Sequence, residues 1–308
     1  MLRIADARTG HLVEIPAAPR RLLRSCVHLP ALGAGTDDGT GIGPLHLRVP
    51  LIGDVLARTA ELNGLQVVTV LTTPELTPDR ARALDRVMAV LGIHPPTVIG
   101  PHRPEAALGG PADVHVTAGD TDPGDLAGGA RIEVGRVDTT APEQDAADPA
   151  DDTPAAADTS APVDAVGLAG GTPAAAGTPA AADAAGPADG APDPLAVRLL
   201  LLGSRYGTPV TVTGAALAGA GRTLRDWRRS VADWAREPSR PVPADLLRRS
   251  HTALAEDLDV AAVLALLAEV AGRSDVPAGA KFETFAHLDR VLGLDLARDV
   301  GHQRPTGP

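Results

Sequence analysis

A long tract of small and acidic residues divides the chain, and it constrains the fold more than any other feature. Residues 138–192 are mostly Ala, Asp, Pro, Thr and Gly, with ten acidic residues and no Lys or Arg. Such a segment cannot bury enough apolar surface to offset the entropy that ordering would cost, so we predict a disordered linker. The chain is then expected to fold as two units, residues 1–137 and residues 193–308.

Most of the net charge resides in this linker. The 308 residues carry a formal net charge of −11, of which the linker contributes −10, whereas the N-terminal unit carries −2 and the C-terminal unit +1. The acidity of the whole chain therefore says little about the partners of the folded units. We interpret the linker as a solvated tether. The alternative is an acidic segment that competes with nucleic acid for a basic surface.

Apolar runs and cysteine content indicate where the protein resides. No apolar run approaches the roughly 20 residues that a membrane helix needs, and the first residues lack the basic and then apolar layout of a signal peptide. Cys26 is the single cysteine, which excludes a disulfide scaffold and fits a reducing compartment. We expect a cytoplasmic protein without a membrane span.

The N-terminal unit has the alternating pattern of an α/β fold. Residues 22–29 and 66–71 are apolar runs of strand length, and the apolar positions of residues 51–62 have the spacing of a helix that packs on one side. A second helix is predicted over residues 78–91, with Thr77 as its N-cap. Strand, helix and strand in this order predict a right-handed parallel crossover.

The C-terminal unit has the pattern of an α-helical bundle. Asp193 is a predicted N-cap for the first helix, and Phe282 and Phe285 mark the last one. The two Trp residues are interpreted as core packing. The four helices before the last are predicted over residues 194–204, 215–236, 244–256 and 260–271.

Three segments of the helical unit match one enzyme family in order. They are Asp193-Pro194-Leu195-Ala196-Val197-Arg198 with the following Arg205-Tyr206 pair, then Glu256-Asp257-Leu258-Asp259, and then the segment from Lys281 to Asp295. Together they resemble the helical, anticodon-binding side of cysteinyl-tRNA synthetases, which are class I aminoacyl-tRNA synthetases. The resemblance implies an anticodon-binding-like domain over residues 193–308.

The N-terminal unit carries shorter matches to the same family. Cys26 stands where the family's strand ends in a metal-binding Cys, and Asp54-Val55-Leu56-Ala57-Arg58 matches the helix that follows. Counting back from Asp54 places Gly43-Pro44-Leu45-His46 on the family's His-Ile-Gly-His motif, with Arg48 on the Arg after it. Asp113-Val114-His115 with Asp120 is similar to the family's Asp-Ile-His-Gly-Gly-Gly-x-Asp. The resemblance thus implies a truncated Rossmann-type, class I synthetase-like domain over residues 1–137.

Carried over residue by residue, the resemblance implies an ATP site. Class I synthetases activate an amino acid by attack of its carboxylate on the α-phosphate of ATP, so positioning and charge stabilisation carry the catalysis. His46 is the predicted catalytic phosphate donor at a helix N-terminus; the alternative is a polar loop residue. His115 and Asp120 are predicted to line the pocket; the alternative is a surface turn. The complete predicted cofactor-binding set is Gly43, His46, Arg48, His115 and Asp120.

Several parts of the family's machinery are missing. Gly43 replaces the first His of the motif, no Lys-Met-Ser-Lys-Ser loop exists, and the only lysine is Lys281. The family's Zn²⁺ is held by two Cys, a His and a Glu, whereas Cys26 has no Cys partner. No metal site is therefore predicted, and Cys26 is interpreted as a small buried residue at a strand end.

An arginine face indicates RNA binding. Four arginines share one face of the predicted helix 215–236 and its continuation, and such a face neutralises phosphates in RNA-binding proteins. We therefore expect tRNA, and not DNA, as a partner. Acidic residues interleave, so the alternative is a solvated surface. The four are Arg222, Arg225, Arg229 and Arg236.

Three functional hypotheses remain open from the sequence. The first is a degenerate synthetase paralogue that still binds tRNA or a nucleotide but has lost cysteine activation. The second is an enzyme with altered chemistry, similar to the cysteine ligases of actinobacterial thiol synthesis that share this ancestry. The third is a protein-interaction module without catalysis.

Overall fold

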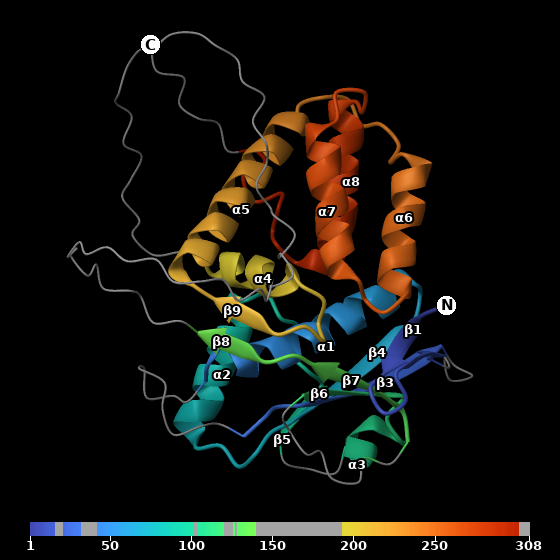
Figure 1. The fold of residues 1–308 in the computed structure, drawn as a ribbon, viewed down its shortest axis with the longest axis vertical. Coiled ribbons are helices and arrows are strands. Elements are labelled where there is room, and N and C mark those ends of the chain that lie inside the picture. The colour runs from blue at the N-terminus through green and yellow to red at the C-terminus, as the bar shows by residue number, and fades with distance from the viewer. Residues whose placement is uncertain are drawn as a thin grey trace, which may run out of the picture.

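The computed structural model describes residues 1–15, 21–31, 42–100, 104–119, 126, 128–139 and 193–301. A sheet forms the base of the molecule, a long helix lies on it, and a group of helices stacks on that helix (Figure 1). Within these residues no helix has both the length and the apolar character needed to cross a membrane. Residues 140–192 of the predicted linker lie outside the described part of the chain.

The central sheet consists of five parallel strands. They are β3 (Leu22–His28), β4 (Gln66–Thr72), β5 (Val98–Gly100), β6 (Val114–Ala118) and β7 (Ala130–Val134), in the spatial order β5-β4-β3-β6-β7. Counted from β3, this is the order 3-2-1-4-5 of a doubly wound sheet, whose topological switch point lies between β3 and β6. The predicted α/β class and the parallel pairing of the first two core strands are confirmed.

Helix α1 (Pro44–Leu62) covers one face of the sheet, together with α2 (Pro78–Val90), while the short α3 (Pro104–Leu108) lies on the other face (Figure 1). Gly53 allows α1 to approach β3 closely, because a Cβ there would lie 2.5 Å from a methyl carbon of Val27. The predicted start of this helix at residue 51 is wrong. The helix begins at Pro44, where proline is well tolerated at the first position, and continues through Pro50.

An antiparallel hairpin, which the sequence did not predict, joins the edge of this layer. Strands β1 (Arg3–Asp6) and β2 (His11–Glu14) pair with each other. The backbone N–H of Ala7 donates to the carbonyl of Arg131 in β7, and Arg3 forms a bridge to Glu256 in the helical part. The hairpin therefore contacts both halves of the chain.

The helical part contains α4 (Pro194–Leu202), α5 (Gly214–Trp234), α6 (Ala244–Ala255), α7 (Val260–Gly272) and α8 (Ala278–Leu292). All five predicted helices are confirmed, as are the N-caps Thr77 and Asp193. Trp227 and Trp234 each pack edge-on against Phe285, which confirms their interpretation as core residues.

The two halves share one hydrophobic core and a strand pair. Strand β8 (Val137–Thr139) pairs in parallel with β9 (Val210–Val212), which precedes α5. The predicted boundary between residues 137 and 138 thus falls inside a strand, because Asp138 and Thr139 pair with β9. Buried residues of the sheet, α1 and the helical part form a single cluster, so the halves are packed together and not merely tethered.

Candidate functional site

The predicted phosphate-binding motif forms the first turn of α1. Gly43 is the N-cap, and its backbone N–H donates to Nδ1 of His46 at 2.9 Å. The other ring nitrogen, Nε2, lies 3.2 Å from the carbonyl oxygen of Ala31. His46 therefore lies inside the helix and not in the loop before it, and both of its nitrogens are engaged by the backbone.

Arg48, predicted to contact a nucleotide, is buried. Its side chain is fully inaccessible, and its guanidinium donates to the carbonyl oxygens of Gly135, Thr208 and Arg205 at 2.9, 2.6 and 3.0 Å. Burial lowers the pKa of Arg48 to about 10. The arginine joins α1 to the segments that carry β8 and β9, and its predicted role in nucleotide binding finds no support in this geometry.

His115 is a strand residue and not a surface turn. It lies in β6, is 3 % exposed, and pairs in register with Cys26 of β3. Asp120, its predicted companion, lies outside the described residues. Because registered neighbours in parallel strands point to the same face, the imidazole and the thiol lie on the α3 side of the sheet.

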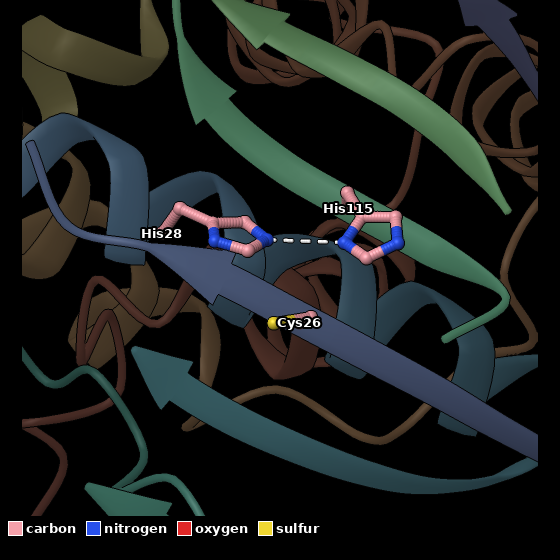
Figure 2. A group of neighbouring side chains, drawn as sticks. All are labelled: Cys26, His28 and His115. Carbon is pink, nitrogen blue, oxygen red and sulfur yellow. Dashed lines mark hydrogen bonds between the residues drawn. The ribbon is translucent and has the colours of Figure 1, made fainter. Parts of the chain in front are cut away.

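His28 completes a cluster with these two residues. It follows Cys26 by two positions in β3 and therefore points to the same face. Nε2 of His28 lies 3.0 Å from Nδ1 of His115, and the ligand atoms of the three residues all lie within 4.8 Å of one another. Figure 2 shows the two rings facing each other across neighbouring strands, with the sulfur of Cys26 beside them.

Burial favours the uncharged forms of Cys26 and His28. It raises the pKa of the Cys26 thiol to about 12, with a further contribution from the negative charge of Glu105. It lowers the pKa of His28 to about 4, and the neighbouring His115 and the positive charge of Arg131 act in the same direction. At neutral pH the cluster is thus a thiol and an uncharged imidazole beside His115. The burial of Cys26 confirms its interpretation as a buried residue.

The sequence did not predict a role for His28. The available signal was the Cys-x-His spacing on a strand, which places both side chains on one face. The pairing with His115 depends on the register of β3 against β6, two strands separated by 85 residues of sequence, and no local pattern contains it.

Motifs that carry the family resemblance meet at the junction of the two halves. Arg205 donates to Asp257 at 2.6 Å and to Asp259 at 2.8 Å, and the hydroxyl of Tyr206 donates to Asp257. Oδ1 of Asp257 also accepts from the backbone N–H of Ala5 at 2.9 Å. These residues stabilise the packing of the helices and the hairpin.

The predicted RNA-binding face lies on α5. Arg222, Arg225 and Arg229 are exposed there. Arg229 pairs with Asp226 at 3.1 Å, whereas within the described residues no ion pair joins Arg222 or Arg225 to a carboxylate. Arg236 lies beyond the end of the helix at Trp234, so the predicted continuation of the helix to residue 236 is wrong.

Comparison with known proteins finds similarity to cysteine ligases over about a third of the chain. No protein-family model matches the chain. An L-cysteine:1D-myo-inositol 2-amino-2-deoxy-alpha-D-glucopyranoside ligase of Thermobifida fusca is 38% identical over 112 residues, which is 34% of this chain and 26% of the relative. A cysteine–tRNA ligase of Microcystis aeruginosa is 31% identical over 129 residues, 35% of this chain and 27% of the relative. A cysteine–tRNA ligase of Paracoccus denitrificans is 36% identical over 115 residues, 36% of this chain and 21% of the relative.

These similarities confirm the resemblance that the motifs indicated. The chain is partially homologous to cysteine ligases of two kinds, one named for tRNA and one for an amino sugar. It spans about a quarter of the length of the curated relatives it matches. The Zn²⁺ ligands that the resemblance implies, two Cys, a His and a Glu, do not fit this chain, because Cys26 is its single cysteine.

Proposed function

We propose that this chain is a protein of the cysteine-ligase type that keeps the scaffold of these enzymes, has lost cysteine activation and binds tRNA. The position of His46 is the main observation that supports the loss of cysteine activation. Both ring nitrogens are bonded to backbone groups of Gly43 and Ala31, so neither is available to the phosphates of ATP. Arg48, two residues further along α1, donates from its two terminal nitrogens to three carbonyl oxygens.

The position of the only lysine supports the same proposal. Lys281 lies on α8, its Nζ donates to the carbonyl of Ala271 at 2.9 Å, and it lies 5.3 Å from the centre of the Trp234 ring. It is therefore a structural part of the helical bundle. A leaving pyrophosphate needs mobile cationic groups beside it, and this chain has no second lysine to supply one.

Support for tRNA as the partner comes from α5 and from the relatives. Arg222 and Arg225 are exposed and have no carboxylate partner among the described residues, so their charges are available to phosphates. Two of the relatives are cysteine–tRNA ligases by name. A short face of this kind neutralises about three phosphates, which gives a log–log salt slope of roughly −2 to −3.

Filter binding of unfractionated tRNA at low and moderate salt tests this proposal. The double variant Arg222→Ala, Arg225→Ala is expected to lose most of the binding and to reduce the salt slope by about 2. Arg248→Ala, which removes an exposed arginine of α6, is the matched control and is expected to bind like wild type. Failure of wild type to retain tRNA at low salt, or equal loss in the control, contradicts the proposal.

A second candidate is favoured by one specific observation. Three of the similar proteins are amino-sugar ligases, with 35 to 39% identity, against 31 to 36% for the cysteine–tRNA ligases. This candidate is a cysteine ligase whose acceptor is an amino sugar. It requires cysteine activation, so cysteine-dependent exchange of pyrophosphate into ATP separates it from the first proposal.

A further inference from the structure

We propose that Cys26, His28 and His115 form a site for one late first-row divalent cation, Zn²⁺ foremost. The ligands are Sγ of Cys26, Nε2 of His28 and Nδ1 of His115. This inference goes beyond the proposed function and does not depend on it. The ligand set differs from the two Cys, His and Glu of the relatives' family, since only Cys26 is shared.

The geometry of the cluster is close to that of a tetrahedral site. Zn²⁺ binds imidazole nitrogen at about 2.0–2.1 Å and thiolate sulfur at about 2.3 Å, which separates its ligand atoms by roughly 3.5 Å. Here the two nitrogens are 3.0 Å apart, and all three ligand atoms lie within 4.8 Å of one another. The two nitrogens therefore need to separate by a few tenths of an ångström, and the sulfur needs to approach them by at most about 1.3 Å. Three protein ligands leave a fourth position for water.

The backbone holds the three side chains in place before any cation arrives. Cys26 and His28 lie on one strand, and His115 is fixed beside Cys26 by the register of β3 against β6. These two strands flank the topological switch point of the sheet, and His28 is the last residue of β3, at the carboxyl end where doubly wound folds bind their ligands. Cys26 is fully buried and His115 almost so, so little side-chain entropy remains to be lost on binding.

A hydrogen bond from outside the cluster fixes the orientation and the tautomer of the His28 ring. Thr72 of β4 donates its hydroxyl proton to the carbonyl of Val27, and its oxygen lies 2.9 Å from Nδ1 of His28. The hydroxyl oxygen thus accepts from Nδ1–H, which leaves the lone pair on Nε2 and directs it toward His115. Metal-binding histidines are typically oriented by such a bond from the second nitrogen.

Binding of one cation releases one proton from the cluster to solvent. In the free protein Nδ1–H of His115 donates to Nε2 of His28, and Cys26 is a thiol. On binding, the thiol loses its proton to solvent and the sulfur becomes a thiolate. The proton on Nδ1 of His115 moves to Nε2 of the same ring, so both imidazoles stay neutral. Glu105 contributes negative charge near the thiol, and Arg131 contributes positive charge near His28.

Titration of the full chain with Co²⁺ tests this inference. Because Cys26 is the only cysteine, a thiolate-to-cobalt charge-transfer band can arise only from this site. We expect such a band at one Co²⁺ per chain, with the intense visible bands of tetrahedral cobalt, and its displacement by Zn²⁺. Absence of the band in folded wild-type protein with excess Co²⁺ overturns the inference without any variant.

Variants then identify the remaining ligands. Cys26→Ser is expected to abolish the charge-transfer band, and His28→Gln and His115→Gln are each expected to weaken Co²⁺ binding by more than tenfold. Thr72→Val removes the bond to Nδ1 of His28, together with the bond to the carbonyl of Val27, and should weaken binding by about 10- to 100-fold. The matched control is His287→Gln, from the His251–His287 pair at 3.1 Å on α6 and α8, and it should bind like wild type. A band unchanged in His28→Gln and His115→Gln, or lost equally in the control, contradicts the site.

Discussion

Arg198 donates from Nη2 to Oδ2 of Asp54 at 2.7 Å, and both side chains are completely buried. Asp54 lies on α1 and Arg198 on α4, so the ion pair joins the sheet-covering helix to the helical part. Arg198 also donates to the carbonyls of Leu91 and Leu292, and Arg58 shares the same carboxylate oxygen at 2.9 Å. Both members of the pair belong to segments that resemble the synthetase family. These two segments therefore contribute directly to the contact between the two halves.

Removing the carboxylate of this pair should strongly destabilise the protein. Asp54→Asn leaves the guanidinium of Arg198 buried without a counter-charge, which typically costs about 3–5 kcal/mol of unfolding free energy. The measurement is denaturant unfolding followed by circular dichroism. Asp79→Asn, which breaks the exposed Arg82–Asp79 pair, serves as the control and should leave the unfolding midpoint nearly unchanged. Similar losses in both variants contradict the role of the buried pair.

The contact between the two halves also depends on Gly135. A Cβ at this position would lie 2.6 Å from the backbone carbon of Thr208 and 2.7 Å from the carbonyl oxygen of Gly207. Because both atoms belong to the backbone, Gly135→Ala should reduce the unfolding free energy by about 1–3 kcal/mol. Gly214→Ala, at the open first residue of α5, has nothing within 4 Å and should be neutral or slightly stabilising. Equal stability of the two variants in the same denaturant series argues against the close approach of Gly135 to the backbone of Gly207 and Thr208.

The protein should lose stability in mild acid, with His287 and His28 both contributing. Burial lowers the pKa of His287, and the neighbouring His251 and the charge of Arg290 act in the same direction. Because the unfolded chain takes up this proton near pH 6.5 and the folded protein only at lower pH, unfolding becomes more favourable as the pH falls below about 6.5.

The variant His287→Gln isolates this contribution. Its stability relative to wild type should improve as the pH is lowered from 7 to 5, in chelator-treated protein. His11→Gln changes an exposed histidine of β2 and should parallel wild type at every pH. A constant difference between His287→Gln and wild type over this range is the contrary result.

The acidic tract should oppose tRNA binding. The tract connects β8 to α4 within the same chain, so its carboxylates are expected to compete with RNA phosphates for the arginines of α5 at the effective concentration that a tether gives. Replacing residues 143–190 by a shorter linker of Gly and Ser keeps β8 and Asp193 intact and should tighten tRNA binding at low salt. The same replacement with a linker that retains the acidic residues is the control and should bind like wild type. Equal binding by all three proteins would show that the charge of the tract does not affect tRNA binding.

Local patterns predicted every helix except the short α3, and they predicted the first two strands of the central sheet but not β5, β6 or β7. The spacing of apolar residues and the capping residues Thr77 and Asp193 were sufficient for the α2 and α4 boundaries within a few residues. The β1–β2 hairpin and the β8–β9 pair were missed because their strands are only three or four residues long. A strand of that length has too few positions to show a period, and long-range pairing determines it instead.

The candidate site could be predicted only in part. His46 and Arg48 were found by resemblance, but their hydrogen bonds to Ala31, Gly135 and Thr208 depend on backbone packing that no motif encodes. The approach of His28 to His115 depends equally on strand register. Sequence reasoning therefore found the inherited positions, whereas their present contacts required the three-dimensional structure.

Cysteine-dependent exchange of labelled pyrophosphate into ATP tests the central claim most directly. The full chain, shown to be folded by circular dichroism, is assayed with ATP, Mg²⁺ and cysteine, both with added Zn²⁺ and with chelator. The account predicts no cysteine-dependent exchange above that of a reaction without protein, because His46 is engaged by the backbone and the only lysine, Lys281, is held in the helical bundle. Robust exchange that requires cysteine and is lost in His46→Ala would contradict the account and favour the amino-sugar ligase.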